Sequence, residues 1–263
     1  MNEEYLKFAK EIAYKAGEIM LKYFKGDNGA NYKIDKTIVT KADTEINTYL
    51  VEKVKERFPT HSVDGEEEQF GGSDFVWVCD PVDGTAMYAR HIPVAVFSLA
   101  LVIDGKPNVG VVYDVFTDSL YWAIKGQGAY KNEDKISVNK ESLGDVGSVC
   151  NIDIMPKPEC YNICEPVNEL MKKSYCVSLG SVIRASMCVA TGDFNLALFP
   201  GMKHKNCDIA AVKIIVEEAG GRVTDLFGNE QRYDSDIKGA IISNRKTHNE
   251  VMNILNKYNI ELF

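Results

Sequence analysis

The sequence predicts an α/β fold in which helices sandwich sheets. Residues 1–60 contain two segments with helical periodicity, and residues 75–132 contain consecutive strand-like segments joined by short turns. The second half alternates helical segments with short strands. Helices covering sheets are the simplest arrangement that buries the apolar side of every segment.

The N-terminal part predicts two amphipathic helices separated by a loop. The first is expected over residues 3–24, where apolar residues recur every three or four positions. The second is expected over residues 44–58, with Asp43 as its N-cap and Pro59 after its end. Segment 26–36 between them is polar, contains glycines and asparagines, and has no periodicity. We therefore expect a mobile loop there.

The next part of the chain predicts an antiparallel sheet. Strands are expected over residues 75–78, 94–103, 109–115 and 120–124. Short connections such as the Asp104-Gly105 turn can join antiparallel neighbours, whereas parallel strands need long crossovers.

The second half predicts helices over residues 182–191 and 209–219, each followed by glycine, and a strand over residues 241–243. Thr247 and Glu250 have the spacing of a capping box, which predicts a last helix ending near residue 258. We expect one domain over residues 1–263, with subdomains of about 1–140 and 141–263.

Composition excludes several classes of protein. Hydrophobic residues make up 45% and charged residues 26% of the 263, as in ordinary globular proteins. The longest apolar run, residues 92–103, is too short for a bilayer span, and the N-terminus lacks the apolar core of a signal peptide. Seven cysteines without a paired framework indicate free thiols in a reducing compartment. We therefore expect a cytoplasmic protein without a membrane partner.

The net charge of −8 argues against a nucleic-acid partner, since phosphate backbones require clustered Lys and Arg side chains. It does not argue against a small phosphate substrate. Divalent cations bound between carboxylates reverse the local field and allow an anion to approach.

The most informative segment is residues 76–85, an apolar strand that leads directly into acidic residues. Asp80 and Asp83 lie three residues apart across a tight turn, and two such carboxylates at close range favour a bridging divalent cation. Gly84 allows a phosphate to approach the backbone, and the Thr85 hydroxyl can bond a water. The alternative is a surface turn, because Asp, Pro and Gly all favour turns.

Other acidic residues fall at the boundaries of predicted elements. Glu66, Glu67 and Glu68 follow a turn at Asp64-Gly65, and Asp43 and Asp208 each begin a helix. Each has a structural alternative, because aspartate is a good N-cap and a glutamate run is often a solvated loop.

The set of motifs, in this order, resembles the inositol monophosphatase family, which belongs to the Mg²⁺-dependent, lithium-sensitive phosphatases. The resemblance covers most of the chain and implies a layered α-β-α-β-α sandwich, as in fructose-1,6-bisphosphatase. It also implies a homodimer. The motifs that carry it are Val39-Thr40-Lys41-Ala42-Asp43, Gly65-Glu66-Glu67, Asp80-Pro81-Val82-Asp83-Gly84-Thr85, Gly110-Val111-Val112-Tyr113-Asp114, Gly126-Gln127-Gly128-Ala129-Tyr130, Asp208-Ile209-Ala210-Ala211 and Glu218-Ala219-Gly220-Gly221.

The resemblance implies two or three Mg²⁺ ions. Glu66, Asp80 and the Val82 carbonyl would bind one, and Asp80, Asp83 and Asp208 would bind a second. A third, weaker ion would lie near Glu66 and the predicted loop. Oxygen ligands of this kind suit Mg²⁺, which keeps several waters and activates one as a nucleophile.

The resemblance also implies which residues handle the proton and the phosphate. Thr85 would orient the attacking water, Asp43 would draw its proton through the Thr85 hydroxyl, and Glu67 would support the same water network. The backbone amides of Gly84 and Thr85 would bind phosphate oxygens. The full set of expected substrate contacts is Asp83, Gly84, Thr85, Gly180, Ser181 and Arg184.

Departures from the family pattern concentrate where the substrate is recognised. Met87 and Cys207 replace an asparagine and a tryptophan, and Gly201 replaces the glutamate that inositol-specific members use to bind substrate hydroxyls. Arg184 has two readings, pairing with a second anionic group of the substrate or a surface ion pair. Lys203, His204 and Lys205 form a basic cluster, which would attract an anion or be a solvated loop.

The leading hypothesis is a phosphatase for a small phosphate monoester resembling inositol 1-phosphate. Within the same chemistry, the alternatives are fructose 1,6-bisphosphate, histidinol phosphate and adenosine 3',5'-bisphosphate. A hypothesis of a different class is a non-catalytic relative that binds or regulates a partner.

Overall fold

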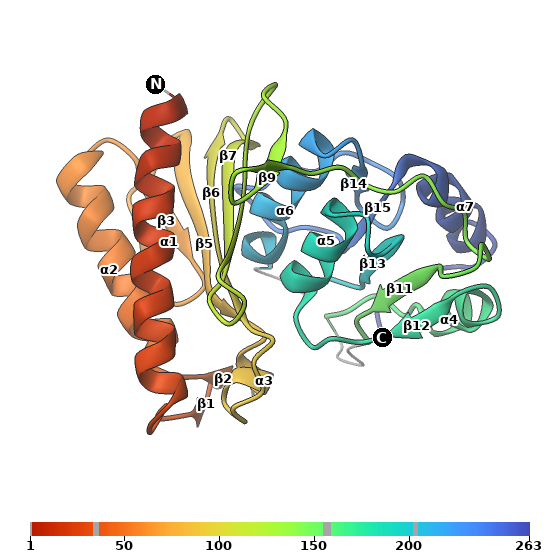
Figure 1. Ribbon diagram of the computed structural model, residues 1–263, viewed down its shortest axis with the longest axis horizontal. Helices are drawn as coiled ribbons and strands as arrows, with labels where there is room; N and C mark the ends of the chain where they lie inside the picture. Colours follow the sequence, from red (N-terminus) through yellow and green to blue (C-terminus); the bar gives the residue numbers. More distant parts are fainter. Residues whose placement is uncertain (1, 34–36, 155–158, 202–204) are drawn as a thin grey trace.

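A computed structural model describes residues 2–33, 37–154, 159–201 and 205–263. Five layers alternate across the molecule, in the order helix, sheet, helix, sheet, helix (Figure 1). The layered α-β-α-β-α prediction is therefore confirmed. No helix in these described ranges has the length and apolarity needed to cross a membrane.

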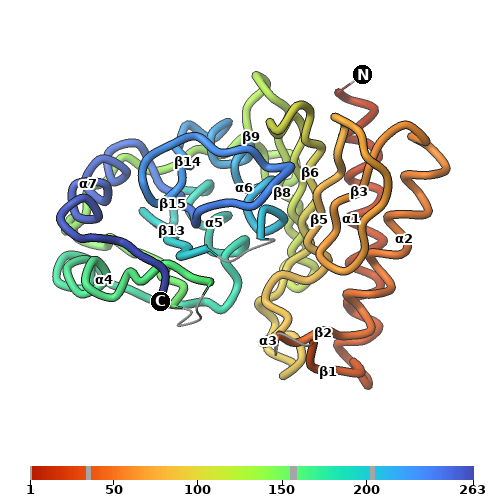
Figure 2. The backbone as a smooth tube through the Cα atoms, turned by 180° about the vertical axis from the view of Figure 1, so that it is seen from behind, coloured from red at the N-terminus to blue at the C-terminus, as the bar shows by residue number. Residues whose placement is uncertain are grey.

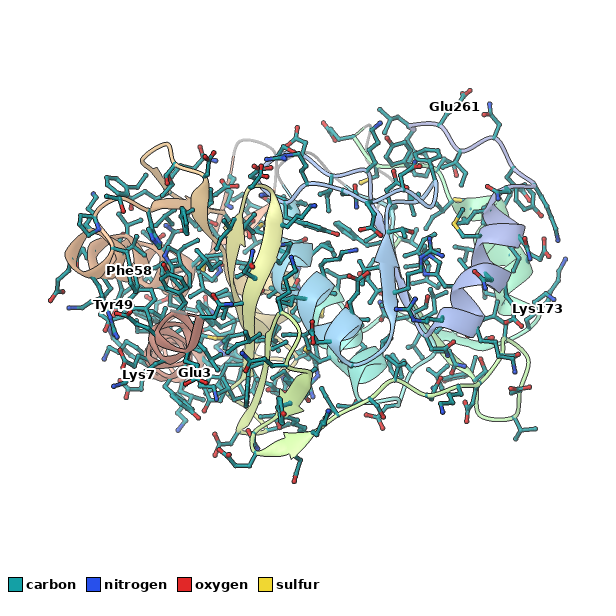
Figure 3. The ribbon with its side chains drawn as sticks, turned by 90° about the horizontal axis from the view of Figure 1, so that it is seen from above. Glu3, Lys7, Tyr49, Phe58, Lys173 and Glu261 are labelled. Atoms are coloured by element: carbon teal, nitrogen blue, oxygen red, sulfur yellow. The ribbon has the colours of Figure 1, made fainter. Side chains whose placement is uncertain are left out.

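The first layer consists of α1 (Asn2–Phe24) and α2 (Lys41–Arg57), which cover one face of the larger sheet. Apolar residues of α1 recur at helical spacing, so one stripe of the helix is buried. Phe8 packs on the ring of Trp77 from β5, with the ring centroids 5.0 Å apart. Figure 3 shows Phe58 and Tyr49 at this end of the molecule and Lys173 at the opposite end.

The larger sheet has eight strands in the order β10-β9-β8-β7-β6-β5-β3-β4, antiparallel except for the β3–β5 pair. The predicted antiparallel strands lie at its centre. The bounds are β3 (Ser62–Gly65), β4 (Gln69–Phe70), β5 (Phe75–Asp83), β6 (Val96–Ile103), β7 (Lys106–Asp114), β8 (Ser119–Ile124), β9 (Ala129–Lys131) and β10 (Asp134–Lys135).

The middle layer consists of α5 (Val182–Ala190) and α6 (Asn206–Glu218), and both pack against the two sheets. The smaller sheet has the order β12-β11-β13-β15-β14, and β11 runs parallel to both of its neighbours. Its strands are β11 (Val149–Ile152), β12 (Tyr175–Val177), β13 (Leu196–Phe199), β14 (Arg222–Thr224) and β15 (Ala240–Ser243). The outer layer consists of α4 (Cys164–Met171) and α7 (Arg245–Leu255) (Figure 2).

Two segments that carry family motifs meet between β8 and α6. The carboxylate of Glu218 accepts hydrogen bonds from the amides of Gly126, at 2.6 Å, and Gly128, at 2.7 Å. The end of α6 is thereby tied to the turn that leads into β9.

The larger sheet ends at Lys135 and the smaller one begins at Val149, on either side of the expected boundary near residue 140. The division into subdomains stays a prediction.

The structure corrects the predicted helix starts. Helix α2 begins at Lys41 with Thr40 as N-cap, and α6 begins at Asn206 after Lys205. Asp43 and Asp208 are therefore third helical residues and not N-caps. The last helix begins after Asn244, whose side chain caps it by accepting a 2.8 Å hydrogen bond from the Thr247 amide, and it ends at residue 255.

The predicted loop over residues 26–36 also differs from the structure. Strand β1 (Asn31–Tyr32) pairs with β2 (Ile38–Val39) as a short antiparallel ribbon, although residues 34–36 lie outside the described part of the chain. Figure 2 places this ribbon beside the short helix α3 (Thr85–Tyr88). Alternating polar and apolar residues are too few in so short a strand to give a sequence signal.

Candidate metal centre and active site

Asp80 and Asp83 lie at the end of β5, where the register with β6 is interrupted. Asp80 is paired with Ser98 and Asp83 with Val96, so the intervening residues form an irregularity. The Asp80 carboxylate accepts a 3.0 Å hydrogen bond from the Val82 amide. Asp80 is 1% and Asp83 is 8% exposed, so both acidic groups are buried. A surface turn, the alternative open from sequence, does not describe this segment.

The N-terminus of α5 fixes the Asp83 carboxylate. One carboxylate oxygen, Oδ2, accepts hydrogen bonds from the Ser181 hydroxyl, at 2.5 Å, and from the Ile183 amide, at 2.9 Å. Ser181 is the N-cap of α5, and the positive end of a helix dipole favours an adjacent anion. Because both of these hydrogen bonds go to Oδ2, the other oxygen, Oδ1, could ligate a cation.

Asn47 of α2 holds the turn that carries Glu66. Its side-chain oxygen accepts from the Glu67 amide, and its side-chain nitrogen donates to the Glu68 carbonyl, both at 3.2 Å. Gly65 is required here, because a Cβ atom at this position would lie 2.1 Å from the Asn47 side-chain oxygen. A helix residue and a glycine therefore set the place of the Glu66 carboxylate.

Glu66, Asp80 and Asp208 converge, although they come from three separate elements. Their carboxylates and the Cys207 sulfur lie within 4.8 Å of one another. Burial and the nearby Asp208 carboxylate raise the pKa of Cys207 well above its ordinary value, so this thiol stays protonated. The ligands on offer are therefore carboxylate oxygens.

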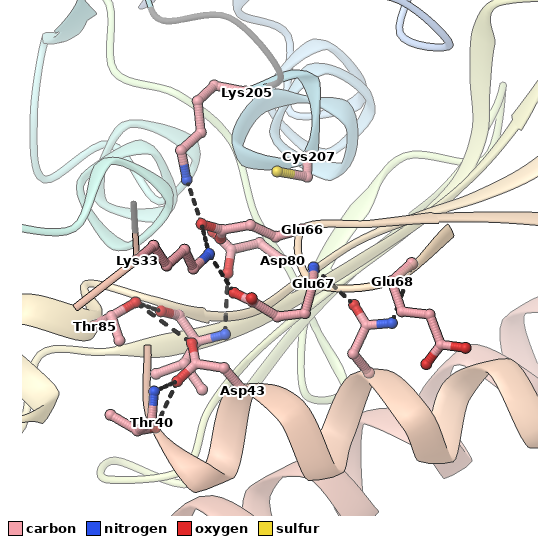
Figure 4. Close-up of polar contacts among 12 residues, drawn as sticks. Lys33, Thr40, Asp43, Glu66, Glu67, Glu68, Asp80, Thr85, Lys205 and Cys207 are labelled. Atoms are coloured by element: carbon pink, nitrogen blue, oxygen red, sulfur yellow. Dashed lines mark hydrogen bonds and ion pairs between the residues drawn. The ribbon is translucent and has the colours of Figure 1, made fainter. Parts of the chain in front are cut away.

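Two lysine ammonium groups reach into the same cluster (Figure 4). Lys33 lies 3.2 Å from Glu66 and 2.5 Å from Glu67, and Lys205 lies 2.9 Å from Glu66 and 3.6 Å from Asp208. Burial alone would lower the pKa of Lys205, but the carboxylates of Asp208 and Glu66 outweigh it and hold that pKa well above its ordinary value. Both side chains thus act as internal cations.

The carboxylates carry more negative charge than the lysines neutralise. Burial raises the pKa of Asp80 far above its ordinary value and that of Asp83 to about 7, and neighbouring carboxylates add to both shifts. Burial also raises the pKa of Asp208, whereas Lys205 and Lys33 outweigh burial at Glu66 and lower its pKa. Buried like charges of this kind fit hard divalent cations with oxygen ligands.

Thr85 and Asp43 lie beside the centre. The Thr85 hydroxyl donates to the Val82 carbonyl at 2.8 Å and makes a looser 3.5 Å contact with the Asp43 carboxylate. The other Asp43 oxygen accepts a 2.8 Å hydrogen bond from the Thr40 amide, within a capping box. Burial raises the pKa of Asp43 to about 7, although the hydrogen bonds from Thr40 oppose the shift. Asp43 can therefore gain and lose a proton near neutral pH.

Thr85 and three of the acidic residues, Glu66, Asp83 and Asp208, line a cavity of about 430 Å³. Its wall includes four of the residues expected to contact substrate, Asp83, Gly84, Thr85 and Gly180. The cavity residues that the sequence did not single out are Tyr32, Thr37, Ile38, Ala86, Arg90, Asp153, Ile154, Ser178, Val182 and Phe199. One of these residues, Asp153, has a sequence signal, because it is an acidic residue directly after an apolar strand.

The model of the inositol monophosphatase family matches residues 1–259. The chain belongs to the inositol monophosphatase family. Its members are phosphoric monoester hydrolases, so this family member is an enzyme of that class.

Similarity between this inositol monophosphatase family member and the relatives described here extends over nearly the whole length of each chain. The fructose-1,6-bisphosphatase/inositol-1-monophosphatase of Thermotoga maritima is 31% identical over 259 residues, which is 96% of each chain. The solved structure of a Thermotoga maritima IMPase has a TM-score of 0.85 at 28% identity and covers 97% of each chain. SaIMPase-II bound to 2'AMP has a TM-score of 0.81 at 27% identity, covering 95% of this chain and 94% of its own.

Arg184 lies outside the cavity of this family member. Its guanidinium forms an ion pair with Asp114 at the end of β7, and the two line a separate small pocket with Tyr121 and Lys131. Asp114 is almost fully buried. Of the two readings of Arg184, the structure thus presents an ion pair, and the partner is a buried carboxylate.

The backbone excludes a side chain where inositol-specific members carry glutamate. Gly201 has a φ of +81°, in the left-handed region, and a Cβ atom there would lie 2.5 Å from the Gly239 amide nitrogen. Lys203 and His204 of the predicted basic cluster lie outside the described residues. Lys205, its third member, pairs with Glu66 in the carboxylate cluster.

Proposed function

We propose that this chain is a Mg²⁺-dependent phosphatase for a small phosphate monoester. The observation that carries the proposal is the convergence of buried carboxylates from β5, α6 and the turn after β3. Their mutual repulsion is relieved by divalent cations more fully than by two lysines.

Glu66, Asp80 and the Val82 carbonyl would hold one ion, and Asp80, Asp83 and Asp208 a second; a third would bind near Glu66. When bound, Mg²⁺ lowers the pKa of a water and polarises the phosphate ester. Val82 can serve because a carbonyl oxygen has two lone pairs, of which Thr85 uses one.

The proton of the attacking water would pass toward Asp43. The Thr85 hydroxyl donates to the Val82 carbonyl and lies 3.5 Å from the Asp43 carboxylate, so rotation of its hydrogen from Val82 to Asp43 would let it accept from a water and pass a proton on. A pKa near 7 at Asp43 suits a proton acceptor at neutral pH. Glu67, held by Lys33, would order the neighbouring water.

The phosphate would bind at the start of α3. Gly84 is the N-cap of this helix and Thr85 its first residue, and amides in a first helical turn lack intrahelical acceptors. Gly180 also lines the cavity, and the next residue, Ser181, is the N-cap of α5 and donates to the Asp83 carboxylate. A cavity of about 430 Å³ suits a small ester.

The physiological substrate within this class is open to direct test. Inositol 1-phosphate, fructose 1,6-bisphosphate, histidinol phosphate and adenosine 3',5'-bisphosphate are the candidates to compare. Gly201 supports a substrate range that is not restricted to inositol phosphate, because this position cannot provide a carboxylate.

Phosphate release from this panel, with Mg²⁺ and with a chelator, tests the proposal. Asp83→Asn should reduce kcat at least about 100-fold, because it removes a metal ligand's charge. Glu68→Gln is the control, since it removes one charge from the turn that carries Glu66 without being an expected metal ligand, and it should change kcat less than about twofold. Equal release by wild type and the Asp83 variant, or release unaffected by the chelator, would refute the metal assignment.

Three further properties complete the proposal. Lithium should inhibit, because a small cation with affinity for oxygen ligands can enter the same carboxylate site. A homodimer and a cytoplasmic location are proposed on the family relationship and on composition, and light scattering of the purified protein measures the first.

A further inference from the structure

Three parallel strands of the smaller sheet end at the cavity. Asp153 and Ile154 follow β11, Ser178 and Gly180 follow β12, and Phe199 ends β13, and all five residues line the cavity wall. The same cavity is also lined by Glu66, Asp83 and Asp208, which come from the turn after β3, from β5 and from α6. Asp153 is close enough to Asp208 for their charges to interact, so this wall borders the proposed metal centre and can contact the alcohol portion of an ester bound there.

The chain order makes this a favoured place for a ligand. From β11 the chain passes through α4 on the outer face to β12, and then through α5 on the inner face to β13 on the other side of β11. The chain thus leaves β11 toward β12 on one side, and it leaves the neighbouring β13 through α6 toward β14 on the other side, so the connections diverge at the β11–β13 pair. In open α/β sheets, ligands bind outside the carboxyl ends of strands at such a point.

Asp153 is the charged residue at this position. Its amide donates a 3.0 Å hydrogen bond to the Leu198 carbonyl of β13, which extends the parallel pairing by one residue and fixes the backbone. Asp153 is only 9% exposed, and burial raises the pKa of its carboxyl to about 6, although the side chains of Asn151 and Ser178 oppose the shift. A buried carboxylate in a cavity wall needs hydrogen-bond donors.

The other acidic residues of the described wall are already committed. Glu66, Asp83 and Asp208 face the metal centre, and Asp153 is the fourth acidic residue that lines the cavity. Gly201, after β13, can carry no side chain. In the part of the wall that the structure describes, an acceptor for the alcohol portion therefore comes from the end of β11.

We propose that Asp153, supported by Ser178, determines specificity by accepting hydrogen bonds from hydroxyl groups on the alcohol portion of the substrate. The inference rests on the proposed phosphatase function and narrows its substrate class to phosphate esters of polyols. A carboxylate here favours an ester with free hydroxyls over one with an apolar alcohol. It also repels a second phosphate placed against this wall, so monophosphates are preferred over bisphosphates.

A pair of esters with one carbon skeleton isolates this contact. Glycerol 2-phosphate and isopropyl phosphate differ only in two hydroxyl groups. Wild type should prefer glycerol 2-phosphate, and Asp153→Asn should reduce kcat/KM for it about tenfold, the value of one hydrogen bond to a charged group, mainly through KM. The kcat/KM of Asp153→Asn for isopropyl phosphate should differ from the wild-type value by less than about twofold. Glu68→Gln, which removes a charge outside this cavity, should leave the preference intact.

Several results would overturn the proposal. If Asp153→Asn lowers kcat/KM equally for both esters, Asp153 acts on the metal centre or on the fold. If the preference for glycerol 2-phosphate over isopropyl phosphate is unchanged, Asp153 does not contact the alcohol portion. A larger loss on 2-aminoethyl phosphate than on glycerol 2-phosphate would assign the carboxylate to an ammonium group instead. Thermal unfolding of Asp153→Asn checks that the variant is folded, and Asp153→Ser provides a second small polar replacement.

Binding without catalysis separates this inference from the proposed function. Saturation-transfer NMR with myo-inositol, with Mg²⁺ and inorganic phosphate present, should give a signal for wild type and for Glu68→Gln that Asp153→Asn greatly reduces. If wild type hydrolyses no ester, the phosphatase proposal fails while this measurement still decides the role of Asp153. An equal signal from all three proteins would refute the hydroxyl contact.

Discussion

The ammonium group of Lys205 lies 2.9 Å from the Glu66 carboxylate, so residues 139 positions apart in the chain form an ion pair inside the proposed metal centre. Lys205 also lies 3.6 Å from Asp208 and is itself largely buried. An ammonium and a divalent cation compete for the same oxygens. In the metal-free protein, the lysines neutralise part of the carboxylate charge. A bound metal ion would replace them in this role.

Replacing Lys205 should tighten Mg²⁺ binding. In Lys205→Met, the carboxylates keep their charge but lose an internal competitor, so the apparent Kd for Mg²⁺ should fall about three- to tenfold at about pH 8. Titration calorimetry measures it. Lys53→Met, which breaks an exposed pair with Glu56, is the control and should leave the Kd unchanged. Weaker binding in the Lys205 variant would show that the lysine supports the metal.

Asp43 should make the metal-free protein less stable as pH rises. Its folded pKa of about 7 exceeds the ordinary value of 3.8, so the folded state retains a proton that the unfolded state has released. This stabilising contribution is complete below about pH 4 and is lost as pH rises through about 7. In Asp43→Asn, the decrease in Tm from about pH 5 to about pH 8 should be smaller by about 5 °C.

Thermal unfolding with a chelator present measures this difference. The Tm of the variant should still decrease as pH rises, because Asp83 has a similarly raised pKa. Parallel Tm curves for the two proteins would contradict a buried, protonated Asp43.

Asn47 should matter for metal binding although it is not a predicted ligand. Asn47→Ala removes both hydrogen bonds that hold the Glu66–Glu68 turn, so the free energy of unfolding should fall by about 1–3 kcal/mol. Mg²⁺ affinity should fall with it, because Glu66 loses its fixed place. Urea denaturation and calorimetry measure the two effects. Asn259→Ala, at an exposed hydrogen bond, should change neither.

Arg184 should contribute to stability and not to substrate binding. Arg184→Ala leaves the buried Asp114 without its ion-pair partner, and the free energy of unfolding should fall by about 1–3 kcal/mol after allowing for the partial exposure of the arginine. KM for every ester of the panel should stay within about twofold of wild type. A selective rise in KM for bisphosphates would instead support contact with a second phosphate.

Much of the fold is predictable because its signals are local. The stripe of apolar residues in α1, the apolar strands around residues 96–124 and the glycines after α6 each act over a few residues, and the structure has elements at those places. Helix starts were less accurate. Acidic side chains are favoured both at an N-cap and in the first turn of a helix, so the sequence does not tell these two positions apart. Asp43 and Asp208 therefore resemble N-caps in sequence, whereas in the structure Thr40 and Lys205 precede the two helices.

The sequence by itself determined the layered class and the carboxylate-rich character of the centre, since the strand ending in Asp80 and Asp83 and the Glu66 turn are short motifs with local chemistry. Tertiary structure alone decided what surrounds them. Asn47, Lys33 and Asp153 enter the site from remote elements, and Arg184 turns to Asp114. Such contacts depend on how layers pack across tens of residues, and no local pattern of side chains encodes that geometry.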